Sequence, residues 1–278
     1  MLTKEELKKN INTEWQLSHE SLKKYRYGIC KFITSICQKL NFSNQVSSLS
    51  MLITNYFFVK KCYFNFDKLT MAFASILFAS KSESSNNKLG DICKEYISIP
   101  NKRFESENLI KIKNHIEKYE LLIVKELKFD MPTDLPYDFI NVYSDILYPD
   151  NSEDIANFAS KIACDSFFTY ANNIYKNYVV ALASLVIAAK FLNIPTILDD
   201  NFKYIKNMKK FQKKNISEID FCKALFEYDG KNIDEDNDDG YFEGLELSEK
   251  LYPNMKMDDL FDCVKMILEF YEDMNNPK

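Results

Sequence analysis

Glycine and proline are scarce in this sequence, with 5 Gly and 7 Pro among 278 residues. Sheet proteins with many tight turns rely on both residue types, so their scarcity favours long helices. The 7 Cys are scattered and include no Cys-x-x-Cys pair, which is typical of buried, reduced thiols rather than of a disulfide framework or a zinc site. The N-terminus lacks the apolar core of a signal peptide. The longest nearly continuous apolar run, residues 178–189, is shorter than the roughly 20 residues that span a membrane.

The sequence also lacks the usual marks of a catalyst or of a nucleic-acid binder. Its formal net charge is −5, whereas a general nucleic-acid-binding protein carries a basic excess. The 2 His, His19 and His115, belong to no metal-ligand or triad motif. No glycine-rich phosphate-binding loop is present. We therefore expect no cofactor, no metal centre and no direct binding to nucleic acid.

One apolar stretch occurs twice in the sequence. Residues 72–81 read AFASILFASK, which at helical spacing is apolar on nearly every side. A helix without a polar face is normally buried in the middle of its domain. Residues 181–190, ALASLVIAAK, repeat the small residues in the same order and also end in lysine. Two copies of one central helix at domain-sized spacing predict two helical domains of one kind.

Apolar periodicity predicts the helices around each central one. In the first domain five helices are expected, at residues 22–40, 46–63, 68–82, 89–99 and 106–128. A capping box at Thr3 to Glu6 predicts a short helix ahead of them, over about 4–12. In the second domain clear helices are expected at residues 135–148, 154–172, 177–193 and 257–274, with weak ones at 201–212 and 217–227.

The expected organisation therefore has three parts. Residues 1–19 form an N-terminal helix and a lead-in, residues 20–131 form the first domain, and residues 132–278 form the second. Pro132 and Pro136 mark the junction, because a proline disfavours helix in the residue before it. The second domain carries a charged insertion at about 201–250.

Several motifs resemble those of the cyclin family. Arg26–Ile33 resembles the first helix of a cyclin box, and Ile76–Glu83 is similar to the family's LASKxEE signature. Tyr119–Asp130 resembles the end of the fifth helix, and Pro136–Phe139 the start of the second box. Ala163–Ser166 is similar to the NDS element of transcriptional cyclins of the K, T and L type. The order and spacing of these motifs, together with the duplicated helix, carry the resemblance.

The resemblance covers roughly residues 20–194 and 257–274 and implies a fold. That fold is all-α, with two tandem five-helix cyclin boxes, each around a central buried third helix. It also implies a regulatory subunit rather than an enzyme, located in the nucleus alone or in both nucleus and cytoplasm. Such a subunit forms a heterodimer with a cyclin-dependent Ser/Thr kinase, activates it by docking on its C-helix, and acts in transcription or cell-cycle control.

The resemblance assigns the kinase-binding residues by motif. Lys81 and Glu120 correspond to the pair that hydrogen-bonds the backbone around the kinase C-helix. The apolar docking surface corresponds to four further residues: Phe78, Val124, Phe129 and Met131.

Simpler interpretations exist for both charged residues. Lys81 could merely compensate the charge at a helix C-terminus, as we expect for its repeat copy Lys190. Glu120 could form an ion pair four residues away along an exposed helix face. The residues at that spacing are Ile116 and Val124, however, so its own helix offers no such partner.

The sequence departs from the family pattern in three places. Ser82 and Ser84 flank Glu83 where the family usually has an apolar residue and a second Glu. The substrate-docking patch of cell-cycle cyclins would include Tyr25 and Phe32, which do not fit it, so we expect no recruitment of Arg-x-Leu peptides. The acidic segment 235–246 partly matches a calcium loop, and we interpret it as a solvated insertion.

Two alternative functions remain open from the sequence. One is a general transcription factor of the TFIIB type, which also carries two cyclin boxes, but it adds a zinc ribbon and a basic surface that are missing here. The other is a cyclin-fold scaffold that binds no kinase.

Overall fold

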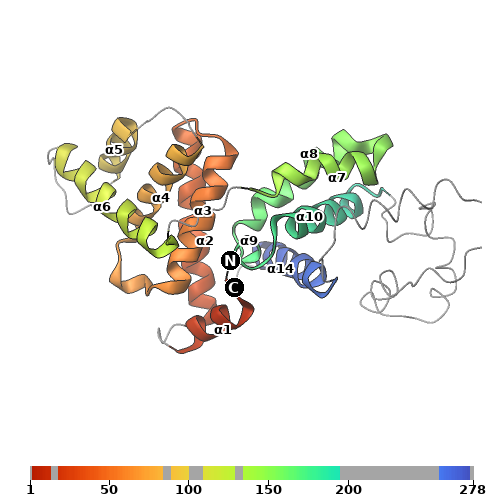
Figure 1. Cartoon of the computed structure of the whole chain (residues 1–278), viewed down its shortest axis with the longest axis horizontal. Coiled ribbons are helices and arrows are strands. Elements are labelled where there is room, and N and C mark those ends of the chain that lie inside the picture. The colour runs from red at the N-terminus through yellow and green to blue at the C-terminus, as the bar shows by residue number, and fades with distance from the viewer. Residues whose placement is uncertain are drawn as a thin grey trace, which may run out of the picture. The chain divides into compact units, whose positions relative to one another are not determined.

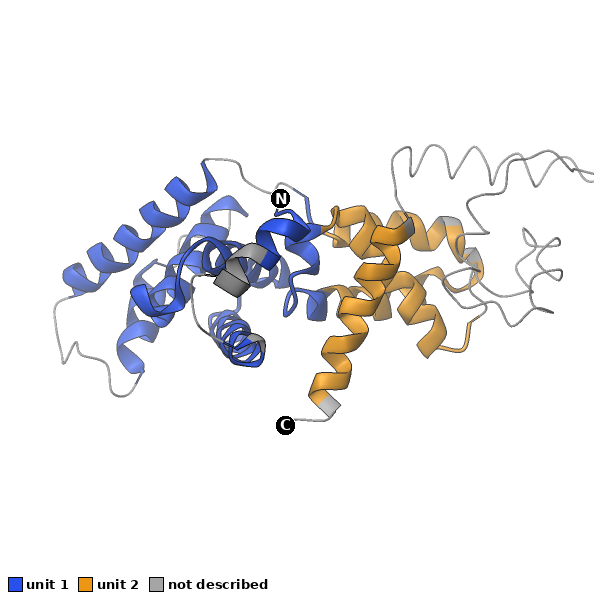
Figure 2. Cartoon of the chain, turned by 90° about the horizontal axis from the view of Figure 1, so that it is seen from below, with its two compact units in different colours: residues 1–135, 164–174 blue, residues 136–163, 175–278 orange. Residues whose placement is uncertain are grey.

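The structure is a computed structural model that describes residues 2–13, 18–83, 89–99, 109–128, 134–194 and 257–275. Within these ranges all regular secondary structure is helical, which confirms the predicted all-α class. The chain divides into two compact units (Figure 2). The first unit contains residues 1–135 together with 164–174, and the second contains residues 136–163 and 175–278.

The helices of the first unit follow the predicted order, with a short N-terminal helix and then five further helices. Figure 1 shows its helices, which are α1 (Lys4–Thr13), α2 (His19–Lys39), α3 (Asn44–Lys60), α4 (Lys68–Ser82), α5 (Leu89–Ser98) and α6 (Leu109–Leu127). A short 3-10 helix, Tyr63–Asn65, lies between α3 and α4.

Side-chain caps fix where several of these helices begin. The predicted capping box is present: the Glu6 N–H donates to Thr3 Oγ1 at 3.0 Å, and the Thr3 N–H donates to Glu6 Oε2 at 2.9 Å. The Ser18 hydroxyl accepts from the N–H of Ser21, so α2 begins earlier than its apolar stripe indicated. The Asp67 carboxylate accepts from the first N–H groups of α4 in the same way.

Helix α4 is the core of the first unit. Its residues from Thr70 to Leu77 are all buried, and α2, α3, α5 and α6 pack around it. The small side chains of Ala72 and Ala74 let these neighbours approach closely. The polar Ser75 is satisfied inside this core, because the hydroxyls of Ser75 and Thr54 on α3 lie 2.8 Å apart.

The second unit repeats the pattern around α10 (Asn177–Phe191), which is buried from Val179 to Ala189. Against α10 pack α7 (Tyr137–Leu147) and α14 (Met257–Asn275). The helix α8 (Ser152–Ser166) precedes α10 in the chain. The helices expected at 201–212 and 217–227 lie outside the described residues.

One predicted helix is interrupted. A single helix was expected over 154–172, but α8 ends at Ser166 and a short helix, α9 (Ala171–Ile174), follows a turn. The Thr169 hydroxyl donates to the Ser166 carbonyl at 2.6 Å and accepts from the Ala171 N–H at 3.0 Å. Local side-chain bonds of this kind compete with the helical ladder, which explains the break.

Candidate protein-docking site

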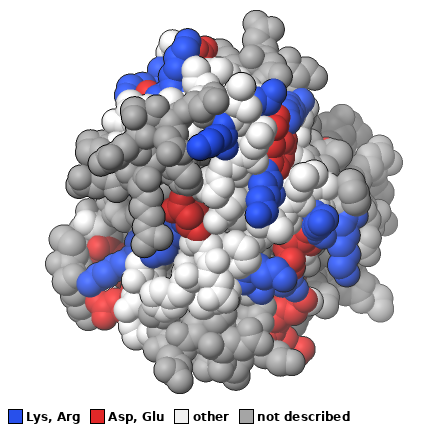
Figure 3. Space-filling model, turned by 90° about the vertical axis from the view of Figure 1, so that its left-hand side faces the viewer, with Lys and Arg blue, Asp and Glu red and all other residues white. Residues whose placement is uncertain are grey.

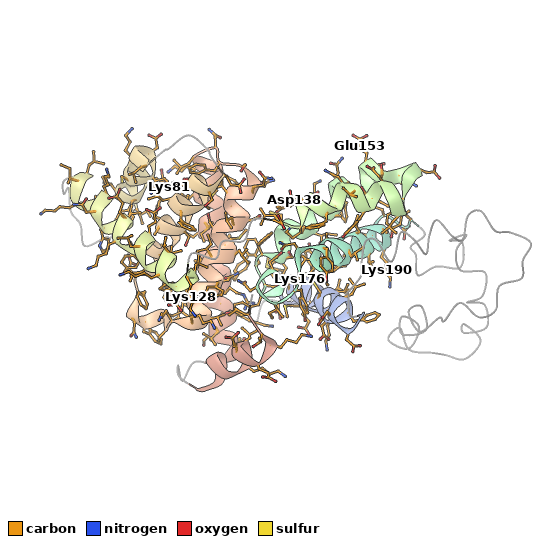
Figure 4. All side chains as sticks on the ribbon, viewed as in Figure 1. Lys81, Lys128, Asp138, Glu153, Lys176 and Lys190 are labelled. Carbon is orange, nitrogen blue, oxygen red and sulfur yellow. The ribbon has the colours of Figure 1, made fainter. Side chains whose placement is uncertain are left out.

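Lys81 lies where the core helix of the first unit reaches the surface. It occupies the last turn of α4 (Figure 4), and its side chain is 44% exposed. The Ser82 hydroxyl donates back to the Phe78 carbonyl at 3.1 Å, and the Glu83 N–H donates to the Ala79 carbonyl at 3.0 Å. The helix ends at Ser82, so Lys81 lies beside its C-terminal end.

Glu120 comes from α6, which packs against α4. The buried stripe of α6 contains Ile112, Ile116 and Ile123. Glu120 lies beside this stripe and has a side chain that is only 12% exposed. A carboxylate that is so far removed from water requires a charged or hydrogen-bonding partner.

That partner is Lys81. Its Nζ atom lies 2.8 Å from both carboxylate oxygens of Glu120. An ammonium has three N–H donors and a carboxylate has about four acceptor positions. Two donors are used in this pair, so one N–H of Lys81 and further lone pairs of Glu120 can still bind another molecule. The pair joins two helices rather than one helix face, which contradicts the simpler interpretation of Glu120 as a member of an i,i+4 pair.

Apolar side chains flank the ion pair along both helices. Phe78 lies three residues before Lys81 on α4, and Val124 lies four residues after Glu120 on α6; both are half-buried. Leu121, which the sequence interpretation did not include, is 61% exposed. It falls outside the apolar stripe of α6, so periodicity alone gave no reason to choose it. Phe129 and Met131 lie outside the described residues.

Three further observations concern metal binding, surface charge and membrane insertion. In the part of the chain that the structure describes, no three His, Cys, Asp or Glu side chains converge as metal ligands would. On the face shown in Figure 3, basic and acidic side chains are interspersed among uncharged ones. None of the described helices is long and apolar enough to cross a membrane. Lys190, the repeat copy of Lys81, is exposed at the end of α10 (Figure 4).

Comparison with known proteins supports the same family. A sequence model of the cyclin N-terminal domain matches residues 1–132, which include Lys81 and Glu120. Over these residues, slightly less than half of its length, the chain is similar to cyclins. Among curated cyclins it is similar to Cyclin-L1 of Danio rerio, with 25% identity over 186 residues, and to human Cyclin-L1, with 23% identity over 174 residues. The aligned parts are 64% and 60% of this chain but 37% and 33% of those cyclins, so the chain spans about a third of their length.

Solved structures share the cyclin fold over most of the chain. A chain of the yeast RNA Pol II CTD kinase CTDK-1 complex gives a TM-score of 0.59 at 15% identity, covering 96% of this chain and 90% of that one. A chain of the yeast TFIIK (Kin28/Ccl1/Tfb3) complex gives a TM-score of 0.58 at 16% identity, covering 96% of this chain and 95% of that one. A chain of the CAK complex from Chaetomium thermophilum gives a TM-score of 0.57 at 12% identity, covering 98% of this chain and 73% of that one.

Proposed function

We propose that this protein is a cyclin, the regulatory subunit of a cyclin-dependent Ser/Thr protein kinase, and has no catalytic activity of its own. The observation that supports this most directly is the Lys81–Glu120 pair, which joins α4 to α6 between Phe78 and Val124. The pair offers one spare donor and spare acceptor positions side by side within a partly apolar surface. Such a surface fits the backbone around the start of a partner helix, where the first N–H groups lack partners within the helix and the residues before it offer free carbonyls.

The partner helix in this proposal is the C-helix of the kinase. Lys81 would donate its remaining N–H to a backbone carbonyl, and Glu120 would accept from a backbone N–H. The apolar side chains around the pair would exclude water, which strengthens both charged hydrogen bonds. Holding the C-helix in this position completes the Lys–Glu pair of the kinase, on which its activity depends. Phe129 and Met131 are proposed to extend the apolar part of the surface.

The process in which the kinase acts is proposed from the relatives. Cyclin-L1 resembles this chain in sequence, and one of the similar folds belongs to an RNA Pol II CTD kinase complex. We infer that the partner kinase acts in transcription, on substrates such as the polymerase tail. The complex of this chain with the kinase would work in the nucleus. A TFIIB-like role fits less well, because the chain is acidic and contains no Cys-x-x-Cys motif.

Co-purification tests the proposal. We would tag the full chain in its native cells and identify kinases bound to the wild type, to the Lys81→Ala/Glu120→Ala double variant and to Lys190→Ala. Lys190→Ala is the matched control, because it changes the corresponding helix position in the second unit. This control should still bind the kinase, whereas the double variant should not. Recovery of promoter DNA or polymerase without any kinase would favour the TFIIB-like alternative. Recovery of no kinase, no promoter DNA and no polymerase would favour the alternative of a cyclin-fold scaffold that binds no kinase.

A further inference from the structure

Helix α3 of the first unit carries a buried amide. Asn55 is 2% exposed, and a buried amide without partners is destabilising. Its Nδ2 atom donates to the backbone carbonyl of Phe167 at 2.9 Å and to that of Thr169 at 3.3 Å. Its Oδ1 atom accepts from the thiol of Cys30 on α2 at 3.6 Å. The amide is therefore satisfied mainly by a segment that follows it by more than 100 residues in the sequence.

A second side chain holds the same turn. The Nε atom of Arg26 donates to the carbonyl of Phe168 at 2.9 Å, and its guanidinium lies 4.3 Å from the centre of the Tyr170 ring. Three successive carbonyls, those of residues 167, 168 and 169, thus accept hydrogen bonds from α2 and α3. The turn that contains them follows the end of α8, where no helical ladder satisfies its carbonyls.

The far end of the segment is held as well. The Nδ2 atom of Asn173 donates to the carbonyl of Leu52 on α3 at 3.0 Å. The carbonyl of Asn173 accepts from the N–H of Leu2 at 2.8 Å, and Leu2 is itself buried. Residues 164–174 are therefore fixed to the first unit at both ends, which is why they group with it and not with the rest of α8.

We infer that residues 164–174 form an intrachain clip that completes the first unit and that Asn55 is its central residue. The next residue along α3, Thr54, has its hydroxyl 2.8 Å from that of Ser75 on α4. A displaced clip would leave the Asn55 amide and the turn carbonyls without partners in the core. The resulting shift of α3 would move its contact with α4, the helix that carries Lys81 in its last turn. Asn55 is thus a positioning residue for the docking site, and this consequence rests on the proposed function.

Hydrogen exchange on the full chain tests the clip without any kinase. The reporters are the N–H groups of residues 167, 168, 169, 173 and 174, which are hydrogen-bonded within the segment. Asn55→Leu keeps the side-chain size but removes the donor, so these amides should exchange about tenfold faster or more. The control Ile92→Ala removes buried apolar contacts on α5. Ile92→Ala should accelerate the exchange of the reporter amides only in proportion to its loss of global stability.

Two further measurements keep the inference falsifiable. If Asn55→Leu does not fold, Asn173→Ala removes only the bond to Leu52 and should accelerate the same amides to a smaller extent. Unchanged exchange in a folded Asn55 variant would overturn the clip. Kinase binding is measured at a temperature where both variants are folded. Asn55→Leu should then weaken kinase affinity, while Ile92→Ala should not. Equal affinities would overturn the positioning role, whereas a wild type that binds no kinase would contradict only the proposed function.

Discussion

Exchanging the charges of Lys81 and Glu120 separates a contact within the chain from a contact with a partner. The single variants Lys81→Glu and Glu120→Lys each place two like charges at the end of α4. The double variant restores one positive and one negative group at the same distance. If the pair only joins α4 to α6, the double variant regains every property of the wild type. If the pair also contacts a kinase, the donor and the acceptor are now reversed and binding stays lost.

The structure gives the size of each effect. The Lys81 side chain is 44% exposed, so the attraction within the pair contributes only about 0.5–1 kcal/mol to the free energy of unfolding. Glu120 is 12% exposed, and removing its partner adds a cost of about 1–3 kcal/mol. Each single variant should therefore lower the Tm by several degrees. The double variant should recover most of the lost free energy of unfolding. It should stay about 0.5 kcal/mol below the wild type, because a glutamate now lies at a helix C-terminus. Removing a hydrogen-bonded charge from an interface costs about 2–5 kcal/mol, which weakens kinase binding roughly 30-fold or more.

The assays are thermal unfolding of the free chain and calorimetric titration with the purified kinase. We expect the double variant to unfold close to the wild type and to bind as poorly as the single variants. Lys190→Glu, the matched change at the end of α10, should bind normally. Recovery of kinase binding in the double variant would refute the docking role of the pair, and so would wild-type affinity in either single variant.

Three other changes test the surroundings of the site and the core. Val124→Asp puts a charge into the half-buried docking surface, so kinase affinity in a titration should fall at least about tenfold while the Tm changes little. Ala74→Leu overpacks the fully buried side of α4 and should lower the free energy of unfolding in urea by about 1–3 kcal/mol. The hydrogen bond from Lys60 lowers the pKa of Glu6 from 4.5 to about 2. The stabilisation is present above pH 4.5 and is lost as the pH falls towards 2, so the Tm values of wild type and Glu6→Gln should differ at pH 6 and converge near pH 2.

The sequence predicted the features that depend on local patterns. The helix at 68–82 followed from an apolar run that a lysine ends, and the structure has α4 at the same residues. The capping box at Thr3 and Glu6 was predicted from two residues at the right spacing. In both cases the physical cause lies within one or two helical turns, so the sequence contains it directly.

Contacts between distant segments could not be derived in this way. Lys81 and Glu120 were paired only through the family resemblance, because nothing in either helix says which residues meet across 39 positions. The association of residues 164–174 with the first unit had no sequence signal, since Asn55 and Asn173 are ordinary polar residues until their burial is known. The break in the predicted 154–172 helix depends on the Thr169 hydroxyl, whose two local bonds replace helical ones.

Activation of a kinase in a purified system tests the central claim most directly. The kinase that co-purifies with the chain would be produced alone, and its phosphorylation rate would be measured with and without an equimolar amount of the chain. We expect little activity from the kinase alone, strong activation by the wild type and by Lys190→Ala, and none by the Lys81→Ala/Glu120→Ala double variant. A kinase that is equally active with and without the wild-type chain would contradict the claim that this protein is an activating subunit.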